Sequence, residues 1–110
     1  MPTIYKVLGQ SAPTAATATT LYTVPASTDS IVSTINVVNT HASTTDVIRI
    51  AVRPAGAVLA TEHYIVYGLS LSAGATFTYT GGITLDATDV VTVYSTSGIS
   101  SFSAFGSEIS

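Results

Sequence analysis

Apolar and hydroxyl-bearing residues alternate along most of this chain, and that period of two is the feature that most limits its possible folds. Alternation of this kind is typical of a half-buried β-strand, because successive side chains leave opposite faces of a strand. The segment DVIRIAVRP shows it most clearly. The side chains expected to point inward are Ile48, Ile50 and Val52, and those expected to point outward are Val47, Arg49, Ala51 and Arg53.

The same period recurs in DSIVSTINVVNT, ATFTYTGG, DVVTVYS and SFSAFGS. In the first of these runs we expect Ile31, Ile35 and Val37 to share one face, and in the second we expect Phe77 and Tyr79 to alternate with threonines. Short clusters of Gly, Pro, Ser and Asn separate the runs and supply turns. About seven to nine short strands at this spacing, with no helix between them, predict an all-β chain folded as an antiparallel β-sandwich. Its topology is either jelly-roll or immunoglobulin-like, because strand patterns do not encode strand order.

The chain has 110 residues, the length of one domain, so we expect residues 1–110 to form a single β-sandwich. The segment SAPTAATATT is low in complexity and is expected to be an exposed, extended connection. The segment GAVLATE is long enough for a helical turn only. There are no cysteines, which excludes disulfides and zinc–thiolate sites.

Charged residues make up only 8% of the chain, against about 25% in an ordinary globular protein. Threonine and serine replace them, with 19 Thr and 14 Ser. One interpretation is a solvated β-protein with a threonine-rich surface. The other is that much of the surface is buried against further copies or a partner, because interface cores are depleted in charged residues. We favour the second, which predicts a homo-oligomer.

Groups able to carry out catalysis or bind metal are few. His41 lies in a loop, and Glu62 and His63 are neighbours whose side chains would leave opposite faces of a strand. Asp86 and Asp89 fall far short of a calcium loop, and we expect them to brace a turn through backbone N–H groups. The sequence therefore predicts a protein that is not an enzyme, with no catalytic residues, no cofactor and no metal site.

The two arginines, Arg49 and Arg53, lie four residues apart on one strand face. They are too few for sequence-independent binding of nucleic acid, and the net charge of −3 also argues against it. We expect them to be interface anchors, or else cross-strand partners of Asp46 or Glu62.

The segment HYIVYG carries Tyr64 and Tyr67, which a regular strand would place on opposite faces. At most one of the two rings would then lie in the core, and the other would be offered to solvent or a neighbour. The residues predicted to form an interface are Arg49, Arg53, Tyr64 and Tyr67.

Nothing in the sequence has the length or apolar character of a membrane-spanning helix. The first residues, MPTIYKVLGQ, also lack the basic and apolar segments of a secretory signal. We therefore expect a protein made in a cytoplasm, with no membrane partner.

Three stretches resemble small Ala/Thr/Ser-rich structural proteins of tailed-bacteriophage virions. They are LYTVPAST with the strand ending VVNT, the long run from IRIAVRPAG to VYSTSG, and the ending FSAFGSEIS. The resemblance implies a virion protein made in the host cytoplasm, most simply a capsid decoration or cement protein that binds and stabilises the shell. It implies a trimer, with the major capsid protein or other virion subunits as partners. The alternative within the same resemblance is a tail, baseplate or fibre module that binds a host receptor or glycan.

Overall fold

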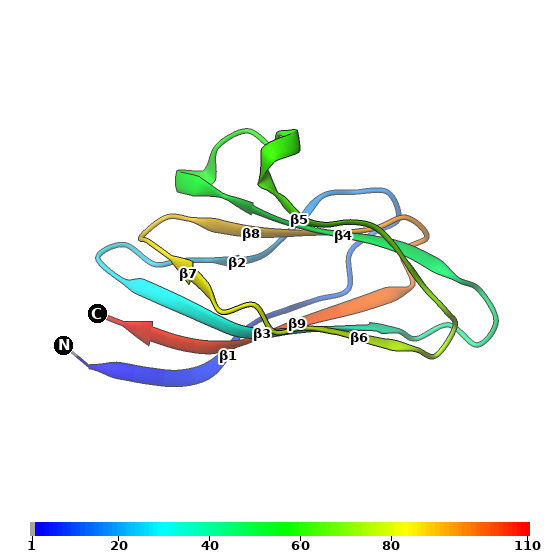
Figure 1. Ribbon diagram of the computed structural model, residues 1–110, viewed down its shortest axis with the longest axis horizontal. Coiled ribbons are helices and arrows are strands. Elements are labelled where there is room, and N and C mark those ends of the chain that lie inside the picture. The colour runs from blue at the N-terminus through cyan, green and yellow to red at the C-terminus, as the bar shows by residue number, and fades with distance from the viewer. Residues whose placement is uncertain (1) are drawn as a thin grey trace.

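A computed structural model describes residues 2–110, which form two antiparallel sheets packed face to face (Figure 1). The fold measures 47 × 27 × 20 Å along its principal axes. An all-β sandwich was predicted, and the nine strands fall within the predicted range. The strands are β1 (Thr3–Ser11), β2 (Thr19–Thr23), β3 (Asp29–Asn39), β4 (Asp46–Arg53), β5 (Tyr64–Leu71), β6 (Thr76–Tyr79), β7 (Ile83–Leu85), β8 (Val90–Ser95) and β9 (Ser100–Ile109), with 3₁₀ turns η1 (Pro54–Gly56) and η2 (Thr61–His63).

The strand order is that of a jelly roll. One sheet runs β1-β9-β3-β6, with β7 also paired to β3, and the other runs β2-β8-β4-β5. The pairings are nested, since β4 pairs with β5, β3 with β6 and β7, β2 with β8, and β1 with β9. The chain therefore pairs as one long antiparallel hairpin whose successive strand pairs are divided between the two sheets. An immunoglobulin-like sandwich would pair the first strand with the second, whereas β1 pairs with β9, so the jelly-roll alternative is the one that holds.

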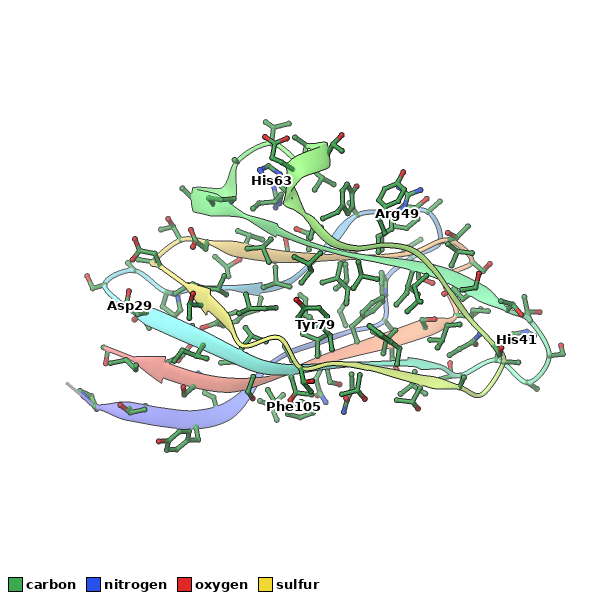
Figure 2. The ribbon with its side chains drawn as sticks, viewed as in Figure 1. Asp29, His41, Arg49, His63, Tyr79 and Phe105 are labelled. Atoms are coloured by element: carbon green, nitrogen blue, oxygen red, sulfur yellow. The ribbon has the colours of Figure 1, made fainter. Side chains whose placement is uncertain are left out.

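The core lies between the sheets and is built from the inward residues of the alternating runs. Ile48 and Ile50 are fully buried there, as predicted, and Phe77 and Tyr79 pack against the core from β6 while their threonine neighbours are exposed. Figure 2 shows Tyr79 between the layers, with Arg49 and Phe105 on the two outer sides. Burial of the apolar core side chains makes the main contribution to the stability of the fold.

Bulges interrupt several strands and change which side chains each face displays. The register of β3 against β9 shifts between Val32 and Thr34. As a result Ile35 and Val37 are buried while Ile31 is 39% exposed on the outer face. The prediction that Ile31 shares a face with Ile35 and Val37 was therefore wrong, because an extra residue reverses the alternation.

A buried carboxylate links strands at one end of the sandwich. Asp46 accepts hydrogen bonds from the hydroxyls of Ser95 and Ser100 and from the backbone N–H groups of Val47 and Ser97. Burial alone would raise the pKa of Asp46, but these four donors outweigh it and hold the pKa below its ordinary value. The carboxylate therefore joins the start of β4 to the β8–β9 connection.

The turn containing Asp86 and Asp89 is braced as predicted. Asp89 accepts hydrogen bonds from the backbone N–H of Ala55 at 2.8 Å and of Asp86 at 2.9 Å. Asp86 accepts one from the N–H of Ala87. The first of these bonds also fixes η1 against the β7–β8 turn.

Candidate interaction surface

The outer face of the four-stranded sheet carries an arginine held between two tyrosine rings. Arg49 on β4 lies opposite Tyr67 on β5 and Tyr94 on β8 in the strand register. Its guanidinium carbon is 4.4 Å from the centroid of each ring. Each such cation–π contact is worth about 0.5–2 kcal/mol. The two contacts fix a long side chain in one conformation.

A bulge in β5 adds a third ring to the same face. Tyr67 pairs with Arg49, Val66 with Ile50 and Tyr64 with Ala51, which leaves Ile65 as the extra residue. Tyr64 and Tyr67 therefore lie on one face, with ring centroids 4.8 Å apart and planes at 80°. The prediction of opposite faces was wrong, because it assumed a regular strand. We name Arg49, Tyr64, Tyr67 and Tyr94 the tyrosine–arginine cluster.

Arg53 lies on the same face but is used within the fold. Its Nε donates to Thr92 Oγ1 at 3.0 Å, and its Nη1 donates to the carbonyl oxygen of Ala57 at 3.1 Å. It therefore anchors the loop after η1. Neither arginine pairs with Asp46 or Glu62 among the described residues, so that alternative for the arginines was wrong.

The donors of Arg49 are not used in this way. Its Nε is buried and has no hydrogen-bond partner among residues 2–110. The ion pair found among residues 2–110 joins Lys6 to Glu108 and does not involve Arg49. A planar cation clamped between rings and lacking a counter-ion suits recognition of a carboxylate or another planar acceptor.

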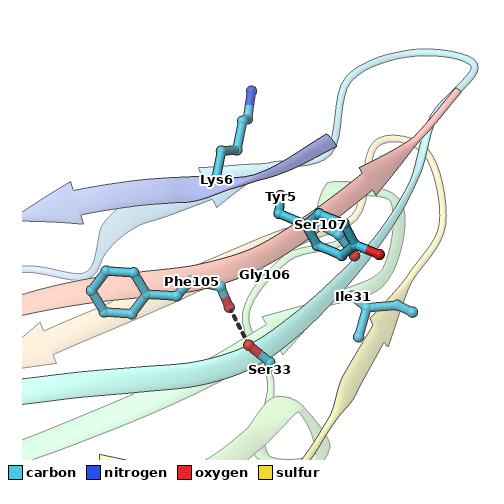
Figure 3. A pocket seen from close by; sticks show the side chains of 7 residues that line it. All are labelled: Tyr5, Lys6, Ile31, Ser33, Phe105, Gly106 and Ser107. Carbon is cyan, nitrogen blue, oxygen red and sulfur yellow. Dashed lines mark hydrogen bonds between the residues drawn. The ribbon is translucent and has the colours of Figure 1, made fainter. Parts of the chain in front are cut away.

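A second surface lies on the outer face of the other sheet, near the termini. Tyr5 is 83% exposed and Val7 50% exposed on β1, and the exposed Ile31 of β3 lies across β9 from Tyr5. Tyr5, Ile31 and Phe105 border a shallow hollow of about 420 Å³. Figure 3 shows Tyr5 and Ile31 around this hollow, with Lys6 directed to the other side of β1. We name Tyr5, Val7, Ile31 and Phe105 the β1 patch.

Sequence reasoning missed Tyr94 and the whole β1 patch. Tyr94 stands in an alternating run, but nothing in that run says that β8 lies beside β4. A signal for part of the β1 patch was present, since three of the four residues in Ile4–Val7 are large and mainly apolar. These residues do not alternate regularly with polar ones, so the pattern did not predict which side chains of the strand point inward.

The two histidines lie apart and serve local turns. His41 accepts hydrogen bonds at Nδ1 from the backbone N–H groups of Ser43 and Thr44, both at 3.1 Å. His63 accepts one from the N–H of Ala60 at 3.0 Å. Among residues 2–110 no three His, Cys, Asp or Glu side chains gather in a way that would hold a metal ion. The described part of the chain also contains no helix of the length and apolar character that crossing a bilayer requires.

Comparisons with family models, with curated proteins and with solved structures find no significant match to this chain. The function is therefore proposed from the two outer surfaces and the sequence pattern.

Proposed function

We propose that this chain is a non-enzymatic structural protein of a bacteriophage virion, a decoration or cement protein that binds the capsid shell. The tyrosine–arginine cluster is the surface that contacts the major capsid protein or another virion subunit. The chain acts as a homo-oligomer in the particle and needs no cofactor, nucleic acid or membrane for this role.

The observation that carries the proposal is Arg49, a fixed cation without a counter-ion on an outer sheet face. Tyrosine and arginine are enriched among the residues that dominate binding energy at protein interfaces. The rings of Tyr67 and Tyr94 already hold the guanidinium, so little side-chain freedom remains to be lost on binding. The matching group on the partner is an Asp or Glu carboxylate.

Composition supports the same role. A surface rich in Thr and Ser and poor in Lys and Glu loses little conformational entropy when it is covered. Jelly rolls are frequent among viral capsid domains and lectins. A fold alone does not fix a function, so the virion setting rests on the resemblance of the sequence stretches described above.

The direct test is co-sedimentation of the purified protein with capsids assembled from the major capsid protein of the same phage. We expect Arg49→Ala to weaken binding about 10- to 100-fold, because it removes a central interface anchor. Arg49→Lys keeps the charge but loses the planar, doubly stacked group, so it should restore binding only in part.

Glu62→Gln serves as the control, because Glu62 is an exposed charge outside the cluster. Circular dichroism and the urea midpoint confirm that each variant is folded. Unchanged capsid binding by folded Arg49→Ala would refute the proposed contact. Absence of any binding by the unaltered protein would refute the decoration role.

The exposed ring of Tyr67 supports one second candidate, a tail or fibre module that binds a host glycan. Tyr67 is 64% exposed beside Tyr64, and tyrosine rings of this kind stack on sugar faces. A glycan array separates the two roles. Specific glycan binding that disappears in Tyr67→Ala would favour the receptor-binding role over capsid decoration.

A further inference from the structure

The strand β1 forms an open edge of its sheet, and its backbone groups on that edge can be identified. The N–H of Ser110 donates to the carbonyl oxygen of Pro2 at 3.1 Å. Hydrogen-bonded and non-hydrogen-bonded pairs alternate along an antiparallel ladder. Ile4 with Glu108, and Lys6 with Gly106, are therefore also hydrogen-bonded pairs. The residues that alternate with Ile4 and Lys6 have backbone N–H and C=O groups that point away from β9. Those three residues are Thr3, Tyr5 and Val7.

This edge lacks the features that usually prevent strands from pairing between molecules. The opposite edge of the same sheet is formed by the short β6 and β7, and β5 in the other sheet has two irregularities. In contrast, β1 runs regularly from Thr3 to Val7 before its register shifts. An edge strand is normally guarded by a free lysine or a bulge.

The lysine on this edge is already neutralised. Lys6 Nζ lies 2.9 Å from Glu108 Oε1. The hydroxyl of Tyr22, from the other sheet, donates to the second oxygen of Glu108 at 2.5 Å. The bond from Tyr22 and the ion pair with Lys6 hold the pKa of Glu108 below its ordinary value. The large apolar side chains exposed on β1 are Ile4 at 52%, Tyr5 at 83% and Val7 at 50%.

We propose that β1 pairs antiparallel with β1 of a second copy of this chain, about a two-fold axis at Tyr5. In that register Tyr5 pairs with the partner's Tyr5, and Thr3 pairs with the partner's Val7. All three residues whose backbone groups face the open edge are then hydrogen-bonded, and two five-stranded sheets become one continuous sheet.

The occupant is a second copy because the edge is complementary to itself. The outward backbone groups are symmetric about Tyr5, so a two-fold axis there satisfies them all. An axis at Ile4 would pair Thr3 with the partner's Tyr5 but leave Val7 outside these pairs. An axis at Lys6 would set two lysines opposite each other and leave Thr3 outside, and one at Val7 would extend the pairing into the bulge.

Charge and apolar surface also match in this register. Each Lys6 lies opposite the partner's Ile4, and the aliphatic part of the lysine side chain covers that isoleucine. The partner's Ile4 is in turn paired with the partner's Glu108, so Lys6 and that carboxylate lie along one line across the strands. No like charges face each other. On the outer face the two β1 patches merge, with the Tyr5 rings adjacent across the axis. A two-fold interface of this kind gives a dimer, in place of the trimer implied by the virion-protein resemblance.

This pairing would supply the homo-oligomer of the proposed function, and its biological role rests on that function. It is tested independently of capsid binding. Loss of self-association leaves the Arg49 result unchanged, and failure of the Arg49 experiment leaves the pairing unchanged, because the two surfaces lie on opposite sheets.

Cysteine cross-linking tests the register, since the natural chain contains no cysteine. In the proposed dimer the two residues 5 are about 5.5 Å apart between Cα atoms, a distance that a disulfide spans. Tyr5→Cys should therefore form a disulfide dimer under mild oxidation. Ile4→Cys should not, because residue 4 lies opposite residue 6 of the partner and more than about 7 Å from its own counterpart.

Val58→Cys provides an exposure control, because Val58 is 88% exposed in a loop away from β1. Equal cross-linking of Tyr5→Cys and Val58→Cys would indicate random collision and overturn the pairing. Faster cross-linking of Ile4→Cys than of Tyr5→Cys would overturn the register.

A charge placed on the axis tests the interface without oxidation. Tyr5→Lys sets two lysines directly opposite each other and removes the exposed ring, so we expect the dimer dissociation constant to rise at least about tenfold. Sedimentation velocity measures this, and Tyr5→Phe should remain dimeric. A folded Tyr5→Lys variant that associates like the natural chain would refute the proposal.

Discussion

Asp46 and Arg49 stand three residues apart on β4 and put opposite charges to different uses. Asp46 is fully buried, and four donors surround its carboxylate. Arg49 lies on the outer face, held by rings that contribute no counter-charge. The first residue stabilises the fold, and the second is the proposed contact with a partner.

Replacing Asp46 by alanine should lower the free energy of unfolding by about 2–4 kcal/mol, because buried donors on Ser95, Ser97 and Ser100 lose their acceptor. Asp46→Asn keeps one acceptor oxygen and should lose less. Urea denaturation at neutral pH measures both. As a control, Asp29→Asn changes an exposed carboxylate and should leave the midpoint unchanged.

The same carboxylate predicts a pH dependence. The pKa of Asp46 is lower in the folded than in the unfolded chain, so its contribution is complete above the unfolded value of about 3.9. That contribution disappears as the pH falls through the lower, folded value. Urea midpoints measured from neutral pH down to acid should therefore fall more steeply for the natural chain than for Asp46→Asn. Parallel curves for the two proteins would contradict this role.

At the scale of the elements, irregularities in the strands decide what each face presents. The bulge in β3 turns Ile31 outward into the β1 patch, and the bulge in β5 brings Tyr64 beside Tyr67. Each bulge also requires space in the neighbouring strand. A Cβ added at Gly106 on β9 would lie 1.9 Å from the carbonyl oxygen of Ile31.

Gly106→Ala should therefore force β9 away from β3 and destabilise the fold by about 2–3 kcal/mol. The matched control is Gly82→Ala, where no atom lies within 4 Å of the added methyl group. The backbone at Gly82 has a φ of +63°, so that control should cost only about 1 kcal/mol. Equal urea midpoints for the two variants would show that the close contact at Gly106 is not limiting.

These irregularities also mark what the sequence could and could not predict. The regular run containing Ile48 and Ile50 predicted the correct inward residues, and the run containing Phe77 and Tyr79 predicted the correct shared face, because period-two alternation maps directly onto a sheet. The bulge at Ile65 left no signal in HYIVYG, so the shared face of Tyr64 and Tyr67 was missed. Arg49, Arg53, Tyr64 and Tyr67 do lie on one outer face, but pairing with Tyr94 depends on strand order, which only long-range packing determines.

At the scale of the whole molecule, the low charge connects the two outer surfaces. With 8% charged residues, neither sheet carries a field that would keep copies apart. One face offers a single fixed cation, and the other offers an apolar edge with open backbone groups. The two associations should therefore respond differently to salt.

Added sodium chloride should weaken capsid binding through Arg49, because an ion pair near the surface is screened. It should leave the β1 pairing unchanged or slightly stronger, since backbone hydrogen bonds and apolar contacts carry little net charge. Co-sedimentation and sedimentation velocity across one salt series measure the two effects. Dissociation of the dimer by salt would show that charge, and not the β1 edge, holds it together.

The central claim is that this sparsely charged exterior is covered by other subunits. Its most direct test is the solution mass of the natural protein, measured by sedimentation equilibrium at micromolar concentration. We predict a mass of two chains, each of 11.2 kDa. A mass of one chain at every concentration, with both sheet faces fully accessible to solvent, would contradict the claim.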